Sequence, residues 1–182
     1  MRDKHFEKTF EILENVKVQI EADSTIVVEG PKGTLKRHFN YPNLKIELKD
    51  NAIMISTDNY SKRDKTMFGT IRAHINNMMK GVCEPYVYKL KVCSDHFPMN
   101  VSANGKQLIV KNYLGEKTPR VVTLDDDVEL KVNGDVVEVS AIDKEKAGTN
   151  AAKIELMLNP GKKDRRVFQD GIYIFDKGGK EL

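Results

Sequence analysis

The sequence predicts an α+β fold of two tandem, duplicated domains, each an antiparallel β-sheet with one helix packed on one face. Short segments in which apolar and polar residues alternate predict strands, and two longer segments with apolar residues at helical spacing predict helices. The same order of segments occurs twice along the 182 residues, and a repeat of roughly 80 residues is typical of a duplicated domain rather than a solenoid. Each predicted helix carries one apolar stripe, which is buried most simply against one side of its own sheet.

The strands are predicted to form β-hairpins. Alternation of apolar and polar residues begins at residues 16–20 and recurs at 44–48 and at 128–132. Each run is followed by turn residues and a second apolar run, the pattern of two strands joined by a short turn.

Two of these hairpins are copies of one another. The segment LKIELKDNAIMIS (44–56) aligns without a gap on VELKVNGDVVEVS (128–140). The second copy contains Asn133-Gly134 at its turn, a strong hairpin signal because both residues tolerate a positive φ. A slip of one residue would turn every apolar side chain outward, so the shared pattern predicts a shared strand register.

The period changes after each of these hairpins, which predicts one helix per repeat. The apolar positions that share a helix face are Phe68, Ile71, Ile75 and Met78 in the first repeat and Ala147, Ala151, Ile154 and Leu158 in the second. The first series is expected to end at Gly81 and the second at Asn-Pro-Gly (159–161), because these residues stop helices.

The repeats place the domain boundary near the end of the first helix. One unit of strand, strand, hairpin and helix covers about residues 16–81 and occurs again at about 87–161. We therefore expect a first α+β repeat with an N-terminal extension at residues 1–82. A second repeat with a basic, RNA-contacting C-terminal segment is expected at residues 83–182.

The charge is mild in total and uneven in distribution. The net charge of +3 and the isoelectric point near 8.7 are shared by many enzymes and do not establish nucleic-acid binding. Residues 123–145 contain eight acids and two lysines, a net charge of −6, so the rest of the chain carries +9. This asymmetry suits a protein with one face on phosphates, although a solvated acidic strand pair is the simpler interpretation.

Two loops in matching positions of the repeats are candidate RNA contacts. The first, Gly-Pro-Lys-Gly-Thr at residues 30–34, lacks the spacing and the Lys-Ser/Thr pair of a nucleotide P-loop, so a tight turn between strands is favoured over a nucleotide site. Both loops place backbone amides beside cations, and a role in contacting RNA and a role as simple turns both stay open. The candidate residues are Lys32 in the first loop, with Lys36 and Arg37 shortly after it, and Gly115, Lys117 and Arg120 in and after the second.

The loop after the second helix is the strongest physical signal for function. It carries four cations, Lys162, Lys163, Arg165 and Arg166, and one acid. A helix C-terminus attracts cations, which explains one or two of them but hardly four that lie outside the helix. Together with Phe168 and Tyr173 further on, they are suited to gripping phosphates and stacking on exposed nucleotides.

The sequence nominates no catalytic residue, metal site or cofactor. The histidines are scattered, without His-x-x-Glu-His or Cys-x-x-Cys spacing, and no nucleophile elbow is present. Cys83 and Cys93 are expected to be reduced, packed thiols. The chain contains no run of the ~20 apolar residues that a membrane helix needs and no secretory signal, so we expect a soluble, unexported protein that contacts no membrane.

Several motifs resemble one protein family over nearly the whole chain. "HINNMMKGV", "YKLKV" and "HFPMNV" follow one another between residues 74 and 101, and "EGPKGTLKRHFN", "KNYLGEK" and "KKDRRVFQDGIYI" match in sequence order. The chain thereby resembles the universal family of the sixth large-subunit ribosomal protein. "NYLGEK" and "DGIY" resemble its eukaryotic type, which is numbered nine in eukaryotic cytosolic ribosomes.

The resemblance implies a structural, non-catalytic constituent of the large (60S) subunit that supports cytoplasmic translation. Its implied partners are large-subunit rRNA near the sarcin-ricin loop and neighbouring large-subunit proteins including the stalk base, with translational GTPases docking nearby. The implied location is the cytoplasmic ribosome, with nuclear or nucleolar passage during assembly. The chain lacks the family's lysine-rich insertion in the first hairpin, so its N-terminal half is expected to make fewer RNA contacts. The alternative is a protein-interaction module whose sheet edges or acidic face recruit partners.

Overall fold

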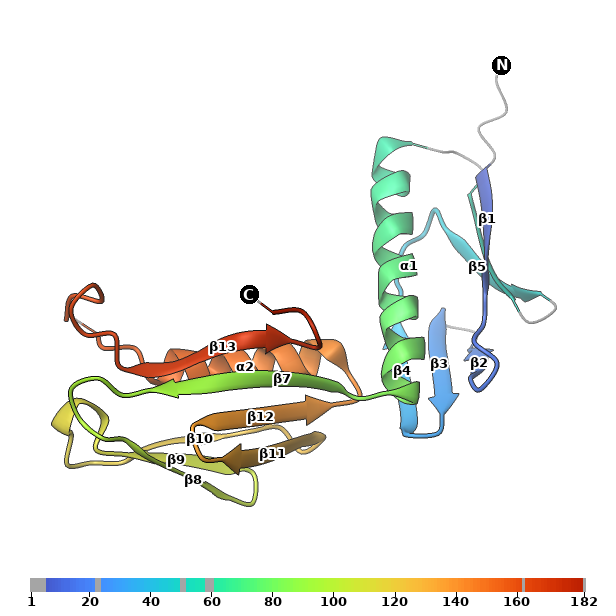
Figure 1. Cartoon of the computed structure of the whole chain (residues 1–182). Helices are drawn as coiled ribbons and strands as arrows, with labels where there is room; N and C mark the ends of the chain where they lie inside the picture. Colours follow the sequence, from blue (N-terminus) through green and yellow to red (C-terminus); the bar gives the residue numbers. More distant parts are fainter. Residues whose placement is uncertain (1–5, 22–23, 50–51, 58–60, 162, 182) are drawn as a thin grey trace. The chain divides into compact units, whose positions relative to one another are not determined.

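The computed structural model divides the chain into two compact units, Met1–Pro85 and Tyr86–Leu182. It describes residues 6–21, 24–49, 52–57, 61–161 and 163–181, and each unit is described here by itself (Figure 1). The boundary predicted between residues 82 and 83 falls in the last turn of the first helix.

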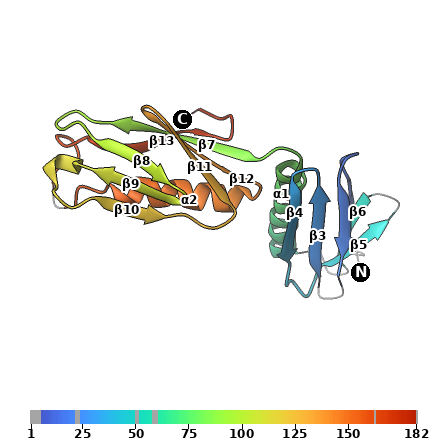
Figure 2. The same ribbon diagram turned by 90° about the horizontal axis from the view of Figure 1, so that it is seen from below.

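The first unit contains two antiparallel three-stranded sheets and one helix. One sheet has the order β1-β6-β5 and the other the order β2-β3-β4. The helix, α1, lies against β3 and β4 (Figure 2). The elements are β1 (Phe6–Glu11), β2 (Lys17–Ile20), β3 (Thr25–Gly30), β4 (Gly33–His38), β5 (Lys45–Lys49), β6 (Ala52–Thr57) and α1 (Lys62–Cys83).

The second unit repeats this plan and adds a strand. Its sheets have the orders β11-β12-β7-β13 and β10-β9-β8, and the helix, α2, lies against β7, β12 and β13. The elements are β7 (Tyr86–Cys93), β8 (Asn100–Asn104), β9 (Gln107–Lys111), the short 3-10 turn η1 (Tyr113–Gly115), β10 (Arg120–Thr123), β11 (Val128–Asn133), β12 (Val136–Ala141), α2 (Lys144–Met157) and β13 (Gly171–Lys177).

The strand registers confirm the duplication. Ile46 lies opposite Ile55 in the first unit as Leu130 lies opposite Val139 in the second, so both residues of the pair are shifted by 84 positions. The same shift relates every described pair of the two hairpins, as the ungapped alignment requires. The predicted α+β fold of two similar halves is therefore confirmed.

The sequence did not reveal that β1 is also part of the repeat. It pairs with β6 in the way that β7 pairs with β12, so the segment expected to be an extension is a strand of the sheet. Its sequence, FEKTFE, has too few apolar residues to show a clear alternation. Among the described residues, β13 has no counterpart in the first unit.

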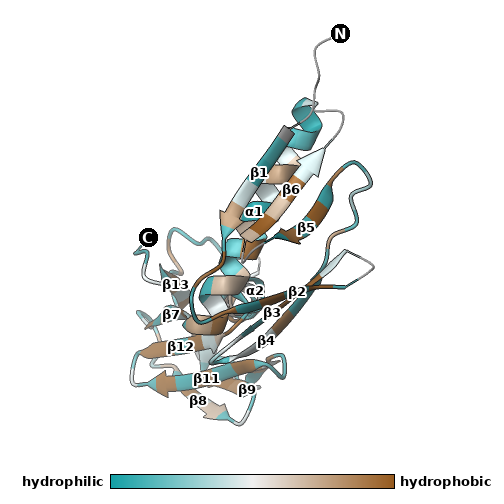
Figure 3. Ribbon diagram, turned by 90° about the vertical axis from the view of Figure 1, so that its right-hand side faces the viewer, coloured by the Kyte–Doolittle hydropathy of each residue, from teal (hydrophilic) through white to brown (hydrophobic). Residues whose placement is uncertain are grey.

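The predicted apolar stripes form the interior of both units. Ile75 is 1% exposed, and all eight positions predicted to share the helix faces are buried. In the second unit, the buried residues of α2 join those of the sheets in one core cluster. Figure 3 shows the matching alternation of apolar and hydrophilic residues along the strands.

A buried carboxylate fixes the start of α1. Ser61 and Asp64 form a capping box, in which each side chain accepts a hydrogen bond from the other residue's backbone N–H. The Tyr41 hydroxyl also donates to Asp64, at 2.7 Å. The hydrogen bonds from the Ser61 and Tyr41 side chains outweigh the effect of burial and lower the pKa of Asp64 to about 2.

The end of α1 differs from the prediction. Gly81 lies inside the helix, which continues to Cys83. Gly81 has no positive φ, so it does not act as a stop. The helix ends because Glu84 precedes Pro85, whose ring disfavours the α conformation in the residue before it, and Glu84 is extended at φ −134°.

No helix among the described residues combines the length and the apolar character needed to cross a bilayer.

We expect Ile75→Asp to lower the free energy of unfolding by about 4 kcal/mol or more, because a carboxylate without a partner would be buried in the core. The matched control is Ala73→Asp, at an exposed position on the same helix. Urea unfolding followed by circular dichroism measures both, and equal stability of the two variants would contradict the assigned helix face.

We expect Asp64 to stabilise the fold in a pH-dependent way. The pKa of Asp64 is about 2 in the folded protein against 3.8 ordinarily. The contribution of Asp64 to the free energy of unfolding is therefore complete above pH 3.8 and is lost as the pH falls through 2. The difference in unfolding free energy between the parent and Asp64→Asn should shrink as urea unfolding is moved from pH 6 to pH 2. Glu47→Gln, at an exposed position, is the control, and a difference that does not depend on pH would refute the proposed linkage.

Candidate nucleic-acid interface

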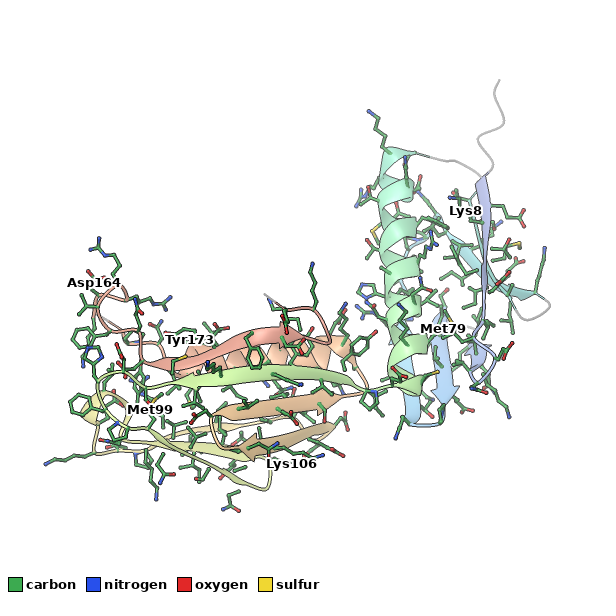
Figure 4. All side chains as sticks on the ribbon, in the orientation of Figure 1. Lys8, Met79, Met99, Lys106, Asp164 and Tyr173 are labelled. Atoms are coloured by element: carbon green, nitrogen blue, oxygen red, sulfur yellow. The ribbon has the colours of Figure 1, made fainter. Side chains whose placement is uncertain are left out.

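Three loops of the second unit meet at one end of its sheets. Their described residues are 94–99, 112–119, 159–161 and 163–170, and these loops contain most of the predicted RNA-binding residues. Figures 1 and 4 show this end of the unit, with Asp164 near the tip of the last loop. Four sets of contacts, described next, hold the loops together.

The carboxylate of Asp170 joins the first loop to the third. It is 1% exposed and accepts hydrogen bonds from the backbone N–H groups of Asp95 and His96, at 2.7 and 2.9 Å. Its second oxygen lies 2.6 Å from Nδ1 of His96. Burial raises the pKa of Asp170, but the two backbone N–H donors and the His96 side chain outweigh it, so the pKa lies below its ordinary value.

Tyr113 joins the second loop to the third. Its ring is buried, and its hydroxyl donates a hydrogen bond to the carbonyl of Leu158, the residue that ends α2. The same hydroxyl lies 3.5 Å from the carbonyl oxygen of Asp170. Burial raises the pKa of this phenol. An aromatic side chain thus satisfies a helix carbonyl that would otherwise lack a partner.

The second loop has an unusual backbone conformation and contacts the first loop. Asn112, Leu114 and Gly115 all have a positive φ, of 63°, 48° and 78°. The Asn112 side chain donates to the carbonyl of Pro98 at 3.0 Å. An added Cβ at Gly115 would make an ordinary van der Waals contact with the ring of Phe97 at 3.6 Å, so the positive φ, and not a lack of space, favours glycine here.

Arg120 is held inside the protein. Its guanidinium donates to both carboxylate oxygens of Glu116 at 2.8 and 2.6 Å and to the carbonyls of Met157 and Asn159 at 2.7 and 3.1 Å. It also stacks on the ring of Tyr113, 4.3 Å from the centroid. These contacts use donors that a phosphate would need, so the structure favours a positioning role for Arg120 at the end of α2.

The third loop exposes the cations that the sequence predicted, apart from Lys162, which lies outside the described residues. Lys163, Arg165 and Arg166 are exposed. Arg166 forms a local ion pair with Asp164 at 2.8 Å. The Nζ of Lys163 lies 5.0 Å from the centre of the Phe168 ring.

The two predicted aromatic residues occupy different sides of this loop. The Phe168 ring packs on His96, with the centroids 5.1 Å apart, and is half-buried. Tyr173 is 41% exposed, and its hydroxyl donates to the carbonyl of Gln169 at 3.0 Å. Only Tyr173 therefore presents a substantial ring face for stacking.

Lys117 completes the exposed cations of the second unit's candidate site. It is exposed in the second loop, and no hydrogen bond or ion pair engages it among the described residues. The structure therefore brings Lys117 to the same end of the unit as the third loop.

The predicted residues of the first unit are not gathered in this way. The backbone N–H of Lys32 donates to the carbonyl of Val82 at 3.0 Å, which ties the β3–β4 turn to α1. Lys36 is exposed and lies 3.5 Å from Glu21. Arg37, its neighbour on the strand, points to the opposite face of the sheet and packs over the Phe39 ring at 5.8 Å.

The acidic run of the second unit is neutralised by its own lysines. Asp125 pairs with Lys153 at 2.8 Å and Asp126 with Lys106 at 2.5 Å, and Asp127 pairs with Lys146. The run is thus neither a bare acidic face nor a shared ligand set. Among the described residues, no group of three or more His, Cys, Asp or Glu side chains is arranged to hold a metal ion, and Cys83 and Cys93 are free thiols.

Sequence reasoning missed the residues that build the site. Neither the pairing of His96 with Asp170 nor the role of Tyr113 was predicted. The sequence held only an acid directly before β13 and an aromatic residue close to Gly115, and neither feature identifies its partner. Their partners lie more than 40 residues away in the chain, beyond the reach of local patterns.

Comparisons with known proteins identify the relatives of the chain. The family described as "Ribosomal protein L6" matches residues 12–84 and 97–171, one segment in each unit. The large ribosomal subunit protein uL6 of Methanosarcina mazei is 40% identical over 174 residues, covering 96% of this chain and 98% of the relative. The protein of the same name from Nanoarchaeum equitans is 45% identical over 179 residues, covering 94% and 93%. That from Methanococcus vannielii is 41% identical over 172 residues, covering 94% of each.

We expect Arg120→Met to lower the free energy of unfolding by about 2 kcal/mol, because it leaves the last carbonyls of α2 without a charged donor. Lys117→Met, in the same loop, should change stability by less than about 0.5 kcal/mol. Urea unfolding checks both, and a fully stable Arg120→Met would argue against the positioning role.

Proposed function

Because the chain belongs to the ribosomal protein L6 family, we propose that it is a structural constituent of the large ribosomal subunit that binds rRNA with the loops at one end of its second unit. The observation that carries this proposal is the exposed third loop, whose cations project from a base fixed by the buried Asp170 carboxylate. A preorganised set of cations loses less conformational freedom on binding than a mobile one.

The mechanism is electrostatic clamping. Lys163, Arg165 and Lys117 form no ion pair among the described residues, so their charges are available to phosphates. Arg166 must exchange Asp164 for a phosphate, which costs little because a solvent-exposed ion pair is weakened by water and salt. Neutralised phosphates release counterions, so binding should weaken steeply as salt rises.

The charge balance elsewhere in the second unit directs RNA to this end. The lysines paired with the run 125–127 are already neutralised by carboxylates. These ion pairs therefore produce only a small electrostatic potential at a distance. The third loop, by contrast, combines four cations, one of them Lys162, with Asp164 as the one acid among residues 161–169. Net positive potential is therefore concentrated at the loop.

The first unit contributes weaker contacts in this proposal. Lys32 and Lys36 are exposed near the β3–β4 turn, but Arg37 packs on Phe39 on the other face of the strand. One turn with two cations suits a secondary contact with the RNA backbone.

The more detailed expectations from the resemblance belong to this proposal as well. They are the sarcin-ricin region as the rRNA target, the stalk base and translational GTPases as neighbours, and a cytoplasmic ribosome with nucleolar passage. The relatives named above are archaeal, so the narrower assignment to the eukaryotic type and to a 60S subunit stays a prediction.

The two rival functions have less support. Membership of this family makes the chain a structural protein and not an enzyme. A protein-interaction module recruiting partners through an acidic face is disfavoured, because the acids of residues 125–127 are each paired with a lysine. Sedimentation of cell extract with and without RNase distinguishes an RNA-dependent association from one between proteins.

We expect replacement of Lys162, Lys163, Arg165 and Arg166 by Gln to leave the fold intact and to weaken rRNA binding. The charges lie in an exposed loop, where their loss removes little packing. The slope of log affinity against log salt should fall by up to about 3 to 4, at roughly 0.7 to 0.9 for each phosphate contact that is lost. Filter binding to an RNA fragment carrying the sarcin-ricin region, over a salt series, gives the slope.

The control replaces Lys17, Lys45 and Lys49 of the first unit by Gln and should change the slope less. A folded quadruple variant with the parent's slope would reject the loop as the phosphate-binding site. If the parent itself failed to bind rRNA and to sediment with large subunits, the proposed function would be rejected as well.

A further inference from the structure

An open depression of about 660 Å³ lies beside the basic loop of the second unit. Among the described cations proposed to bind phosphates, Arg165 lines it. Its volume falls within the roughly 300–1,000 Å³ of typical small-ligand sites. It is lined by Cys93, Ser94, Asp95, Arg165, Gln169 and Tyr173.

The acid in this depression does not suit a phosphate. Among the described residues no hydrogen bond or ion pair engages the carboxylate of Asp95, whose backbone N–H is held by Asp170 at 2.7 Å. A carboxylate only accepts hydrogen bonds and repels a phosphate. An exposed acceptor next to a cationic loop suits a ligand that has donors as well as negative charge.

One wall of the depression is an aromatic platform. The ring of Tyr173 is 41% exposed, and its hydroxyl is anchored on the carbonyl of Gln169 at 3.0 Å. The ring lies over Gly171, where an added Cβ would approach the ring carbon Cζ to 3.0 Å. The glycine therefore lets the ring lie close to the strand with one face open, and an open aromatic face stacks on nucleic-acid bases. Figure 4 labels Tyr173 on this side of the unit.

We propose that this depression binds one unstacked guanine base of RNA. Tyr173 stacks on the base, the Asp95 carboxylate accepts hydrogen bonds from its N1–H and 2-amino groups, and Arg165 contacts the adjoining phosphate. This inference rests on the proposed function, because it names the nucleotide that the same end of the unit recognises. Proteins commonly read single-stranded RNA by stacking a base and bonding its Watson–Crick edge.

The carboxylate selects guanine over the other bases. Guanine presents two adjacent donors, N1–H and the 2-amino group, that match the two oxygens of a carboxylate. Adenine and cytosine place a ring-nitrogen acceptor beside their amino group, which a carboxylate repels, and uracil flanks its single N–H with two carbonyls. A bidentate base contact discriminates by about tenfold or more.

The test uses the full-length protein and fluorescein-labelled RNA hexamers, with fluorescence anisotropy at fixed low salt. The hexamer UUGUUU should bind about tenfold more tightly than UUUUUU. A hexamer with inosine in place of guanine, which keeps N1–H but lacks the 2-amino group, should bind with intermediate affinity. Asp95→Asn should remove the preference for guanine and leave the affinity for UUUUUU at least as high, because a negative charge is lost. Tyr173→Ala should weaken UUGUUU by about tenfold.

The matched control is Asp126→Asn, an exposed acid of the same unit that pairs with Lys106, which should keep the preference for guanine. Circular dichroism verifies that each variant is folded. Equal affinity for UUGUUU and UUUUUU, or a full guanine preference in Asp95→Asn, would overturn the inference. If replacing the loop cations still lowers the slope of log affinity against log salt for the rRNA fragment, only the proposed guanine site is rejected. If neither hexamers nor the rRNA fragment bind the parent, the proposed function fails with it.

Discussion

The buried carboxylate of Asp170 is the interaction on which the functional end of the second unit depends. At 1% exposure it must find hydrogen-bond donors inside the protein, and it finds them in two backbone N–H groups and the ring of His96. This requirement brings residues 94–96 to the start of β13. The third loop begins at the end of α2 and ends at Asp170, so both of its ends are fixed while its cations stay in solvent.

A second constraint acts at the C-terminus of α2. Tyr113 and Arg120 both supply donors to the last carbonyls of the helix, and the cation lies on the aromatic ring. The loop that carries Gly115 and Lys117 is therefore built around the helix end. The guanidinium of Arg120, which could otherwise bind a phosphate, supports the end of the helix. The exposed cations are Lys117 and those of the third loop.

The two units show what duplication preserved and what it changed. Both keep the same hairpin register and a helix with one apolar stripe. The second unit alone adds β13 beside β7 among the described residues, and with β13 come Asp170, Gly171 and Tyr173. The equivalent edge of β1 is unpaired in the described part of the first unit, so no described strand there takes the place of β13. This difference explains why the second unit is the one proposed to bind RNA strongly.

The hairpins, the helices and the two-fold repeat could be predicted from the sequence, because burial of one face imposes a period of two or 3.6 residues. This period is visible at Ile46, Ile75 and Ile154. It also indicated the basic loop. It missed β1, whose few apolar residues show no period, and misjudged the end of α1, where Pro85 acts and Gly81 does not. Which of the described cations are free of ion pairs became visible in the folded protein alone. Arg120 and Lys163 are both loop cations in the sequence, yet Arg120 is hydrogen-bonded to carbonyls and Lys163 is exposed. Hydrogen bonds and ion pairs join residues that are distant in the chain, so they leave no periodic pattern in the sequence.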